Sequence, residues 1–258
     1  MLDGAKDFDR YSVRAADDAV GGVDDLYFDD ESWTVRYVVV GTGGSILPRR
    51  ALLAPRFVSE VDAATRGLYT GLTREQLENG PSIEADLPVA AQQEADYYAY
   101  YGTDPYWAGW LGMAPGPAGA TYTSAIPVEQ PARTGGLAAS DGRPGDPHLR
   151  SVRQVEGYRI RSMDGEIGHL EDFLVDDEAW VIRYIVVDTR NWLPGKKVLI
   201  STRWISGVSW ADAEVHADLG SIEIKEAPAW DPGTPVDREY EIGLHSYYGR
   251  PPYWVYDR

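Results

Sequence analysis

Short runs of β-branched and aromatic residues recur along this chain, with turn-forming residues between them. The clearest run covers residues 33–40, Trp-Thr-Val-Arg-Tyr-Val-Val-Val, and follows an Asp-Asp-Glu-Ser turn at residues 29–32. Because such side chains fit the pleated surface of a sheet, this run predicts a strand that pairs with the segment before the turn as a hairpin. Residues 7–14, 51–53 and 57–61 predict further short strands. Several short strands separated by turns are typical of a small closed barrel or sandwich.

Helical signals follow the predicted strands. Residues 72–77 read Leu-Thr-Arg-Glu-Gln-Leu, with a Thr placed to cap a short helix that Asn-Gly-Pro at residues 79–81 would end. Residues 88–101 predict a second helix, with Pro in its first turn and Gly102 at its C-terminus. The predicted class is all-β with short helices.

The whole pattern occurs twice. Residues 11–107 align with residues 158–254 at a constant offset of 147, without a gap, and 30 of the 97 positions are identical. A repeat of this length is longer than a solenoid unit and indicates duplication of a whole domain. We therefore expect two similar folds packed about a pseudo-twofold axis, the usual symmetry of homodimers. The second copy predicts strands at residues 157–161, 167–175, 180–187, 197–201 and 204–208, a strand or irregular segment at 219–224, and a helix at 235–248 that Gly249 ends.

The repeat divides the chain into three parts. Residues 1–107 and 153–258 are each predicted to form a small β-barrel with a C-terminal helical and aromatic extension. Residues 108–152 are rich in Gly and Pro and predict a mostly irregular linker. Because the effective concentration across about 45 linker residues is on the order of mM, we expect the two barrels to pair within one chain.

Composition limits the possible partners. The net charge is −17, with 41 acidic and 24 basic residues, which argues against binding to nucleic acid or anionic lipid. There is no cysteine, no apolar run long enough to span a membrane, and no signal-like segment at the start of the sequence. These features predict a cytoplasmic protein. No motif indicates a cofactor.

Acidic residues cluster at the predicted hairpin turns of both copies. They are the candidate ligands for a divalent cation: Asp29, Asp30, Glu31, Asp176, Asp177 and Glu178. Their spacing differs from that of the twelve-residue calcium loop. The favoured interpretation is structural, with Asp side chains accepting from turn amides and pairing with Arg36 and Arg183. The four histidines do not match between the copies, and we expect no deep pocket between carboxylates on such turns, so no catalytic residue is assigned and the protein is not expected to be an enzyme.

Aromatic residues supply a second group of candidates, for protein interaction. Nine Trp and 17 Tyr stand against four Phe, and Tyr and Trp suit half-buried surfaces and interfaces. On a strand from Trp33, the rings of Trp33 and Tyr37 would share one face, opposite Arg36. For the rings of the extensions, the favoured interpretation is that they cover their own or the neighbouring barrel, and an inter-domain or partner interface is the alternative. The interaction candidates are Trp33, Arg36, Tyr37, Trp180, Arg183, Tyr184, Tyr106, Trp107, Tyr253 and Trp254.

The residues around both turns resemble the PRC-barrel family. The resemblance rests on Asp-x3-Gly-x3-Asp-x3-Asp-Asp-x2-Trp-x2-Arg-Tyr-Val-Val-Val at residues 17–40, and on Asp-Gly-Glu-Ile-Gly at 164–168 followed by residues 176–187. The resemblance implies the β-barrel fold that this family shares with the photosynthetic reaction-centre H subunit. The chain resembles the stand-alone bacterial type of the family, which has no transmembrane helix. The family is mostly described as scaffold or adaptor.

These observations lead to one functional expectation and two alternatives. The expectation is a non-enzymatic adaptor or scaffold that binds another protein, with the acidic field favouring a basic partner. One alternative is a protein that binds a small ligand or a divalent cation at the acidic turns. The other, implied by the resemblance, is a role like that of the H subunit in a photosynthetic complex.

Overall fold

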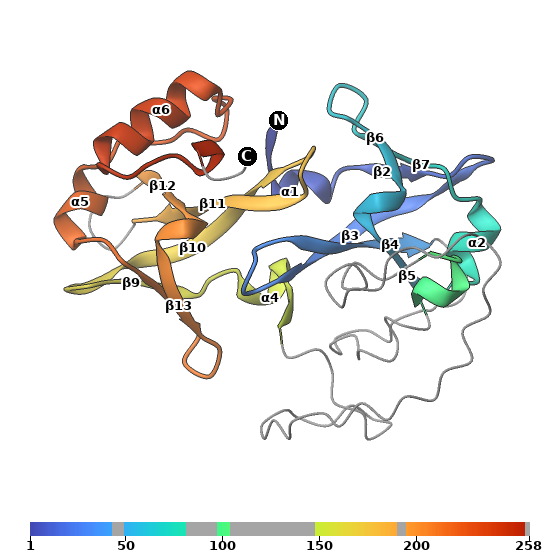
Figure 1. Ribbon diagram of the computed structural model, residues 1–258, viewed down its shortest axis with the longest axis horizontal. Helices are drawn as coiled ribbons and strands as arrows, with labels where there is room; N and C mark the ends of the chain where they lie inside the picture. The colour runs from blue at the N-terminus through green and yellow to red at the C-terminus, as the bar shows by residue number, and fades with distance from the viewer. Residues whose placement is uncertain (43–48, 81–96, 104–147, 190–194, 256–258) are drawn as a thin grey trace.

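The computed structural model describes residues 1–42, 49–80, 97–103, 148–189 and 195–255. Two seven-stranded sheets and a few short helices make up this part of the chain, which confirms the predicted all-β class. Figure 1 shows the two sheets side by side, with α2 beside the first sheet and α5 and α6 beside the second.

The first sheet follows the order β5-β4-β3-β2-β7-β6. All neighbours are antiparallel except the parallel pair β2 and β7. The elements of this half are β2 (Ser12–Arg14), β3 (Ala19–Asp29), β4 (Val35–Thr42), β5 (Arg49–Leu53), η1 (Pro55–Phe57), β6 (Val58–Asp62), β7 (Gly67–Thr70) and α2 (Arg74–Glu78).

The second sheet has the same connectivity, in the order β12-β11-β10-β9-β14-β13, again with one parallel pair, β14 and β9. Its half ends in two helices that lie against one side of the sheet (Figure 1). The elements are β9 (Arg159–Ser162), β10 (Gly165–Asp176), β11 (Val181–Asp188), β12 (Lys197–Ser201), η2 (Thr202–Trp204), β13 (Ile205–Ser209), β14 (Glu214–Ala217), α5 (Ser221–Glu226), α6 (Arg238–Tyr247) and η3 (Tyr253–Val255).

Each sheet curls back on itself through a bent segment. The two terminal strands of the second sheet, β12 and β13, are separated in sequence only by the single turn η2. The first sheet repeats this arrangement with β5, η1 and β6. Consecutive parts of one bent segment therefore begin and end the path of each sheet, and the sheet curls into a small barrel whose two end strands are not paired with each other in the described residues.

The two barrels exchange their first strands. β1 (Leu2–Gly4) leaves the first half and pairs with β10, while β8 (Leu149–Ser151) pairs with β3. The following single-turn helices α1 (Ala5–Phe8) and α4 (Val152–Val155) contact those same recipient strands. Both exchanged segments lie at the boundary between the halves in Figure 1. Because positions in β1 and β8 differ by 147, the exchange is reciprocal.

Backbone hydrogen bonds also cross the boundary between the two halves, which we call the seam. Two of them are related to each other by the same offset of 147. The amide of Val35 donates to the carbonyl of Trp180 at 2.7 Å, and the amide of Ile182 donates to the carbonyl of Trp33 at 2.8 Å. An isolated bridge pairs Thr34 with residue 181, its own equivalent. Two bonds that interchange when 147 is added to or subtracted from each number mark a pseudo-twofold axis passing through this point.

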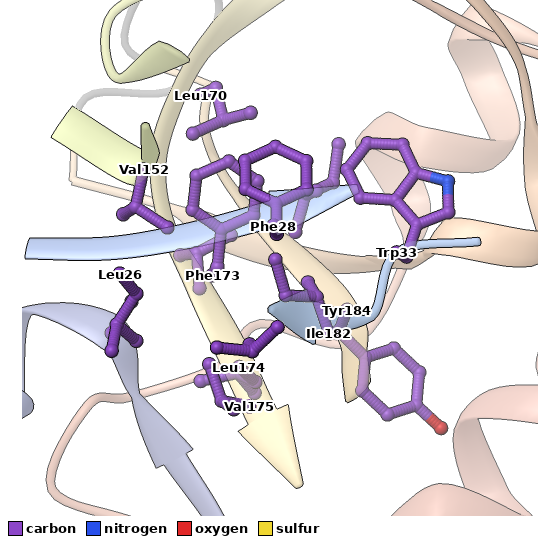
Figure 2. Packing of buried hydrophobic residues seen from close by; sticks show 14 of the residues in the cluster. Leu26, Phe28, Trp33, Val152, Leu170, Phe173, Leu174, Val175, Ile182 and Tyr184 are labelled. Atoms are coloured by element: carbon purple, nitrogen blue, oxygen red, sulfur yellow. The ribbon is translucent and has the colours of Figure 1, made fainter. Parts of the chain in front are cut away.

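One hydrophobic core crosses the seam. Phe28 from the first half packs against Phe173 from the second, with ring centroids 5.5 Å apart, and Trp33 stacks on Phe28 at 5.5 Å. Figure 2 shows these three rings together, with Leu174 and Ile182 beside them. A barrel of about 60 residues buries too little surface to be stable alone, and a shared core removes that limit.

Four local predictions need correction. Residues 7–14 do not form one strand. Phe8 belongs to the single-turn helix α1, Tyr11 follows that helix, and both side chains are buried in the core, so that only Ser12–Arg14 form a strand. Residues 149–151, placed in the irregular linker, form β8. Residues 219–224 lead into α5, where the Gly220 amide donates to the Glu223 carboxylate at 2.7 Å. The strand predicted from Trp33 begins at Val35.

Two helix predictions are confirmed within the described residues. Thr73 caps α2, where its side chain accepts from the amide of Gln76 at 3.2 Å. Asp237 caps α6, and Gly249 follows the helix with a φ of +60°. Residues 97–100 are helical and Gly102 has a φ of +63°, while the rest of the helix predicted at 88–101 lies outside the described residues.

A pair of equivalent glycines permits close packing between the two longest strands of each barrel. A Cβ at Gly168 of β10 would lie 2.0 Å from the carbonyl oxygen of Asp188, and one at Gly21 of β3 would lie 1.8 Å from that of Gly41. Both obstacles are backbone atoms of the paired strand, which can yield only by separating the strands.

Gly168→Ala is therefore expected to lower the free energy of unfolding by about 1–3 kcal/mol, the usual cost of overpacking. Gly165→Ala is the matched control in the same strand, because a Cβ there meets no atom within 4 Å. Urea denaturation of both variants tests this. Equal stability of the two variants would contradict the close approach of β10 and β11.

Candidate functional site

The seam between the barrels gathers most of the candidate residues. Two hairpin turns meet there, one before β4 and one before β11, and each ends in a tryptophan with a left-handed backbone: Trp33 has a φ of +59° and Trp180 of +52°. Both indole rings are buried. The two tryptophans thus bring the two acidic turns together across the pseudo-twofold axis.

Trp33 and Tyr37 do not share a face, contrary to the prediction. Trp33 packs in the core that crosses the seam, whereas Tyr37 lies in a separate cluster and meets Tyr97 with ring centroids 5.4 Å apart. The cause is a register shift in which Tyr27 pairs with Tyr37 but its neighbour pairs with Val35, so that residue 36 is a β-bulge. A bulge reverses the alternation of side chains that the prediction assumed.

The first carboxylate of each turn holds the turn itself. Asp29 accepts from the amides of Glu31 at 3.1 Å and Ser32 at 2.8 Å, and it pairs with the guanidinium of Arg36 at 2.5 Å. These bonds keep the pKa of Asp29 below its ordinary value although burial acts against them. Asp176 repeats the arrangement with Arg183 at 3.1 Å. Both carboxylates thus have the amide and arginine partners that the structural interpretation expects.

The second carboxylate of each turn holds the start of the exchanged strand. The carboxylate of Asp30 lies 2.9 Å from Nδ1 of His148 and 3.1 Å from Nε of Arg150, and its amide donates to the carbonyl of His148 at 2.9 Å. Burial is the largest influence on its pKa, which is raised. In the second half, Asp177 likewise donates its amide to the carbonyl of Met1 at 3.2 Å and pairs with the amino group of that residue.

A third pair of carboxylates receives the exchanged helices. Asp172 accepts from the first turn of α1, at the amide of Lys6, over 3.2 Å. Asp25 bonds the hydroxyl of Ser151, the residue before α4, and lies 3.4 Å from the amide of Arg153. Burial raises the pKa of Asp25, and it raises the pKa of Asp172 to about 6.

Ion pairs across the seam follow the same reciprocal pattern. Nζ of Lys6 lies 3.6 Å from the carboxylate of Glu156, and the equivalent Arg153 lies 3.1 Å from that of Asp9. All four side chains are partly exposed, so these pairs contribute little to stability.

The acidic turns do not assemble a metal site in the described residues, where no group of three or more His, Asp or Glu side chains is placed to hold an ion. Glu31 and Glu178 point to solvent at the tips of the turns. The remaining four candidates are bonded to amides, arginines or the exchanged strands, as described above.

The aromatic extension of the second half encloses a buried polar network. The hydroxyl of Tyr184 lies 3.0 Å from the carboxylate of Glu241 and 3.0 Å from Nε2 of His245. If Tyr184 donates to the carboxylate, its oxygen accepts from Nε2–H of a neutral imidazole. That assignment agrees with the pKa of His245, which burial lowers.

The remaining rings of this extension cover the network. Arg183 stacks on Tyr253 at 4.1 Å and Arg238 on Trp254 at 4.0 Å, and Arg238 also pairs with Glu241 at 3.1 Å. These rings therefore fold over their own barrel. The corresponding candidates of the first half, Tyr106 and Trp107, lie outside the described residues.

Two adjoining recesses open along one side of the seam and share Glu31, Trp33 and Ile205. The first has a volume of about 530 Å³ and is bounded by η2, the start of β11 and Tyr253. The second, which we call the β13 slot, has a volume of about 560 Å³. The β13 slot is lined by Asp30, Glu31, Trp33, His148, Arg150, Ile205, Ser206, Gly207, Val208 and Trp210.

Three large side chains among the ten residues that line the β13 slot have no similar counterpart in the repeat. His148, Arg150 and Trp210 correspond at the offset of 147 to Met1, Asp3 and Ala63. Sequence reasoning missed this side of the seam because it treated residues up to 152 as linker. The available signal was Leu2, which matches Leu149 when the repeat is extended toward the N-terminus.

Comparison with known proteins bears on the second half alone. Residues 147–226 match the PRC-barrel domain. The match spans β8 to α5 and so takes in every strand of the second sheet except the exchanged β1. No curated protein matches the chain. In the described residues, no helix is long and apolar enough to cross a membrane.

The carboxyl of Asp172 supplies a test of the exchange. Its folded pKa of about 6 lies above the ordinary value of 3.8, so the stability linked to its proton is fully present below about pH 3.8 and is lost as the pH rises through 6. Asp172→Asn keeps an oxygen for the Lys6 amide and removes the titration. We expect the wild type to lose about 1 kcal/mol through this group between about pH 5 and pH 7.5, and the variant to lack that loss.

Urea denaturation at the two pH values gives the free energy of unfolding of the wild type and of the variant. The titration of other groups cancels in the difference between the two proteins. An unchanged pH dependence in Asp172→Asn would show that this carboxyl is not buried under α1.

Proposed function

We propose that this protein is a non-enzymatic adaptor made of two PRC-type barrels in tandem, and that it binds another protein along the seam. For the first barrel, the support is its topology: six strands in the same order as those of the matched half, with one parallel pair at the same place. The identical residues at the two turns add to this support.

The observation that carries the proposal is the pair of adjoining recesses on one side of the seam. Together they offer an elongated surface with indole, phenol and guanidinium groups, which are enriched in protein interfaces, beside the carboxylates of Asp30 and Glu31. The pseudo-twofold counterpart of the β13 slot lacks its histidine, arginine and tryptophan. A feature present on one side of a duplicated scaffold is the kind expected of a binding surface.

The distribution of shifted pKa values supports binding over catalysis. The carboxyl of Asp172 lies beneath an exchanged helix, and Tyr184 and His245 face each other inside the barrel extension. Of the groups that line the recesses, Asp30 and Tyr253 have raised pKa values, and each already has partners in an ion pair or a ring stack. A reacting group would instead need to face a substrate.

The acidic charge points to the chemistry of the partner. A net charge of −17 attracts basic proteins and accelerates their association at low salt. Binding of a divalent cation at the turns is the less favoured alternative, because four of the six candidate carboxylates hold amides, arginines or exchanged strands. Cytoplasmic location, inferred from composition, forms part of the same proposal.

Capture from native lysate tests the adaptor function. Immobilised full-length protein is incubated with lysate at moderate salt, and retained proteins are identified by mass spectrometry. We expect a reproducible partner with a basic surface that is lost at high salt. A photosynthetic partner would favour the role implied by the H-subunit resemblance.

The control is a charge reversal on the seam, Glu31→Lys, in a side chain that is 75% exposed and therefore costs little stability. Retention of the same partner by this variant would place binding elsewhere. The absence of any reproducible partner would contradict the adaptor function and favour a small ligand or cation, which thermal-shift screens would then identify.

A further inference from the structure

β13 is an end strand of the second sheet and has one edge without a paired strand among the described residues. Its paired neighbour is β14. Four consecutive residues of this strand, 205–208, line the β13 slot. The ladder with β14 is shifted between Ile205 and Gly207, so the recess follows a bulged stretch of this strand.

The equivalent edge in the first half carries acidic side chains, and this one carries none. β6 reads Val-Ser-Glu-Val-Asp and β13 reads Ile-Ser-Gly-Val-Ser, so two acidic residues, Glu60 and Asp62, correspond to Gly207 and Ser209. Charged side chains on an edge strand are a common protection against pairing with another chain. β13 has neither charge nor proline, although it occupies the same place in the same fold.

We propose that the β13 slot binds an extended segment of a partner protein, which adds to β13 as a further strand and carries alternating apolar and basic side chains. This inference rests on the proposed adaptor function and specifies how the partner is held. Strand addition supplies affinity through main-chain hydrogen bonds, and the slot supplies selectivity through side chains.

The dimensions of the slot suit such a segment. Residues 205–208 present about 13 Å of edge at the usual rise of a strand, and the recess beside them has a volume of about 560 Å³. The protein already uses the same chemistry twice, since β1 and β8 are three-residue strands added to β10 and β3 from distant parts of the chain.

The side chains of the slot indicate the alternation. Ile205, Val208 and the edge of Trp33 offer apolar surface. Glu31 is 75% exposed, and its carboxylate lies 3.6 Å from Nδ1 of His148. At Trp210 the guanidinium of Arg150 covers the ring at 4.3 Å, which closes one wall. A lysine or arginine of the bound segment would meet Glu31 and the overall negative field.

A displayed library of random 12-residue peptides, selected on the full-length protein, provides the probe. The matched pair of variants is Ser206→Lys and Ser59→Lys, because both serines are exposed and occupy equivalent positions on the two edges. The charge change is the same in both. We expect selected peptides to alternate apolar and basic residues, and Ser206→Lys to weaken their binding at least about tenfold while Ser59→Lys changes it less than about twofold.

Hydrogen exchange distinguishes strand addition from contact by side chains alone. On addition of a selected peptide, amides within 205–209 should exchange more slowly, and those within the equivalent 58–62 should not change. N-methylation of alternate peptide amides should abolish binding in one of the two registers, because it removes the donors that face β13.

Several results would overturn this inference. A library that yields no binder, selected peptides with apolar residues at a helical spacing of three or four, or equal binding of the peptides to both variants would each do so. Concentration-dependent dimerisation of the protein that is lost in Ser206→Lys would also overturn it, because a second copy of the chain would then occupy the slot. If the lysate partner binds Ser206→Lys as well as wild type, the adaptor function stands and the slot is not its site.

Discussion

The reciprocal exchange of first strands is the interaction on which the rest of this structure depends. β1 completes the sheet of the second barrel and β8 that of the first, so each barrel obtains part of its structure from the other half of the sequence. The core that crosses the seam, with Phe28 against Phe173, could not form if the halves separated. The same exchange explains the recurrent acidic residues, since Asp25, Asp30 and their equivalents receive the exchanged segments.

This arrangement also accounts for the location of the functional surface. Exchange brings His148 and Arg150, from the start of one exchanged segment, beside Trp33 of the first barrel and the edge of β13 in the second. Neither barrel alone contains the recess. The two halves are nearly symmetric about the axis, as the paired bonds of Trp33 and Trp180 show, and they become asymmetric where the flanking residues differ.

The sequence predicted the class, the strands and the turn carboxylates because those depend on local patterns, such as the β-branched run after Asp29. It did not predict the exchange, because which sheet a three-residue strand joins is decided by tertiary packing. The only identity between the two exchanged strands is Leu2 with Leu149. The positions of Trp33 and Tyr37 were wrong because the bulge at Arg36 reverses the side-chain alternation. The buried bonds of Tyr184 with Glu241 and His245 join residues about 60 positions apart and have no local signal.

Native-state hydrogen exchange at increasing denaturant tests the central claim, that strand exchange makes the two barrels one cooperative unit. If each barrel is completed by the other, the central amides of β3 and β10 should lose protection with the same free energy and at the same denaturant concentration. Loss of protection in one barrel while the other stays protected would contradict the claim, because it would show that a barrel folds without the strand from its neighbour.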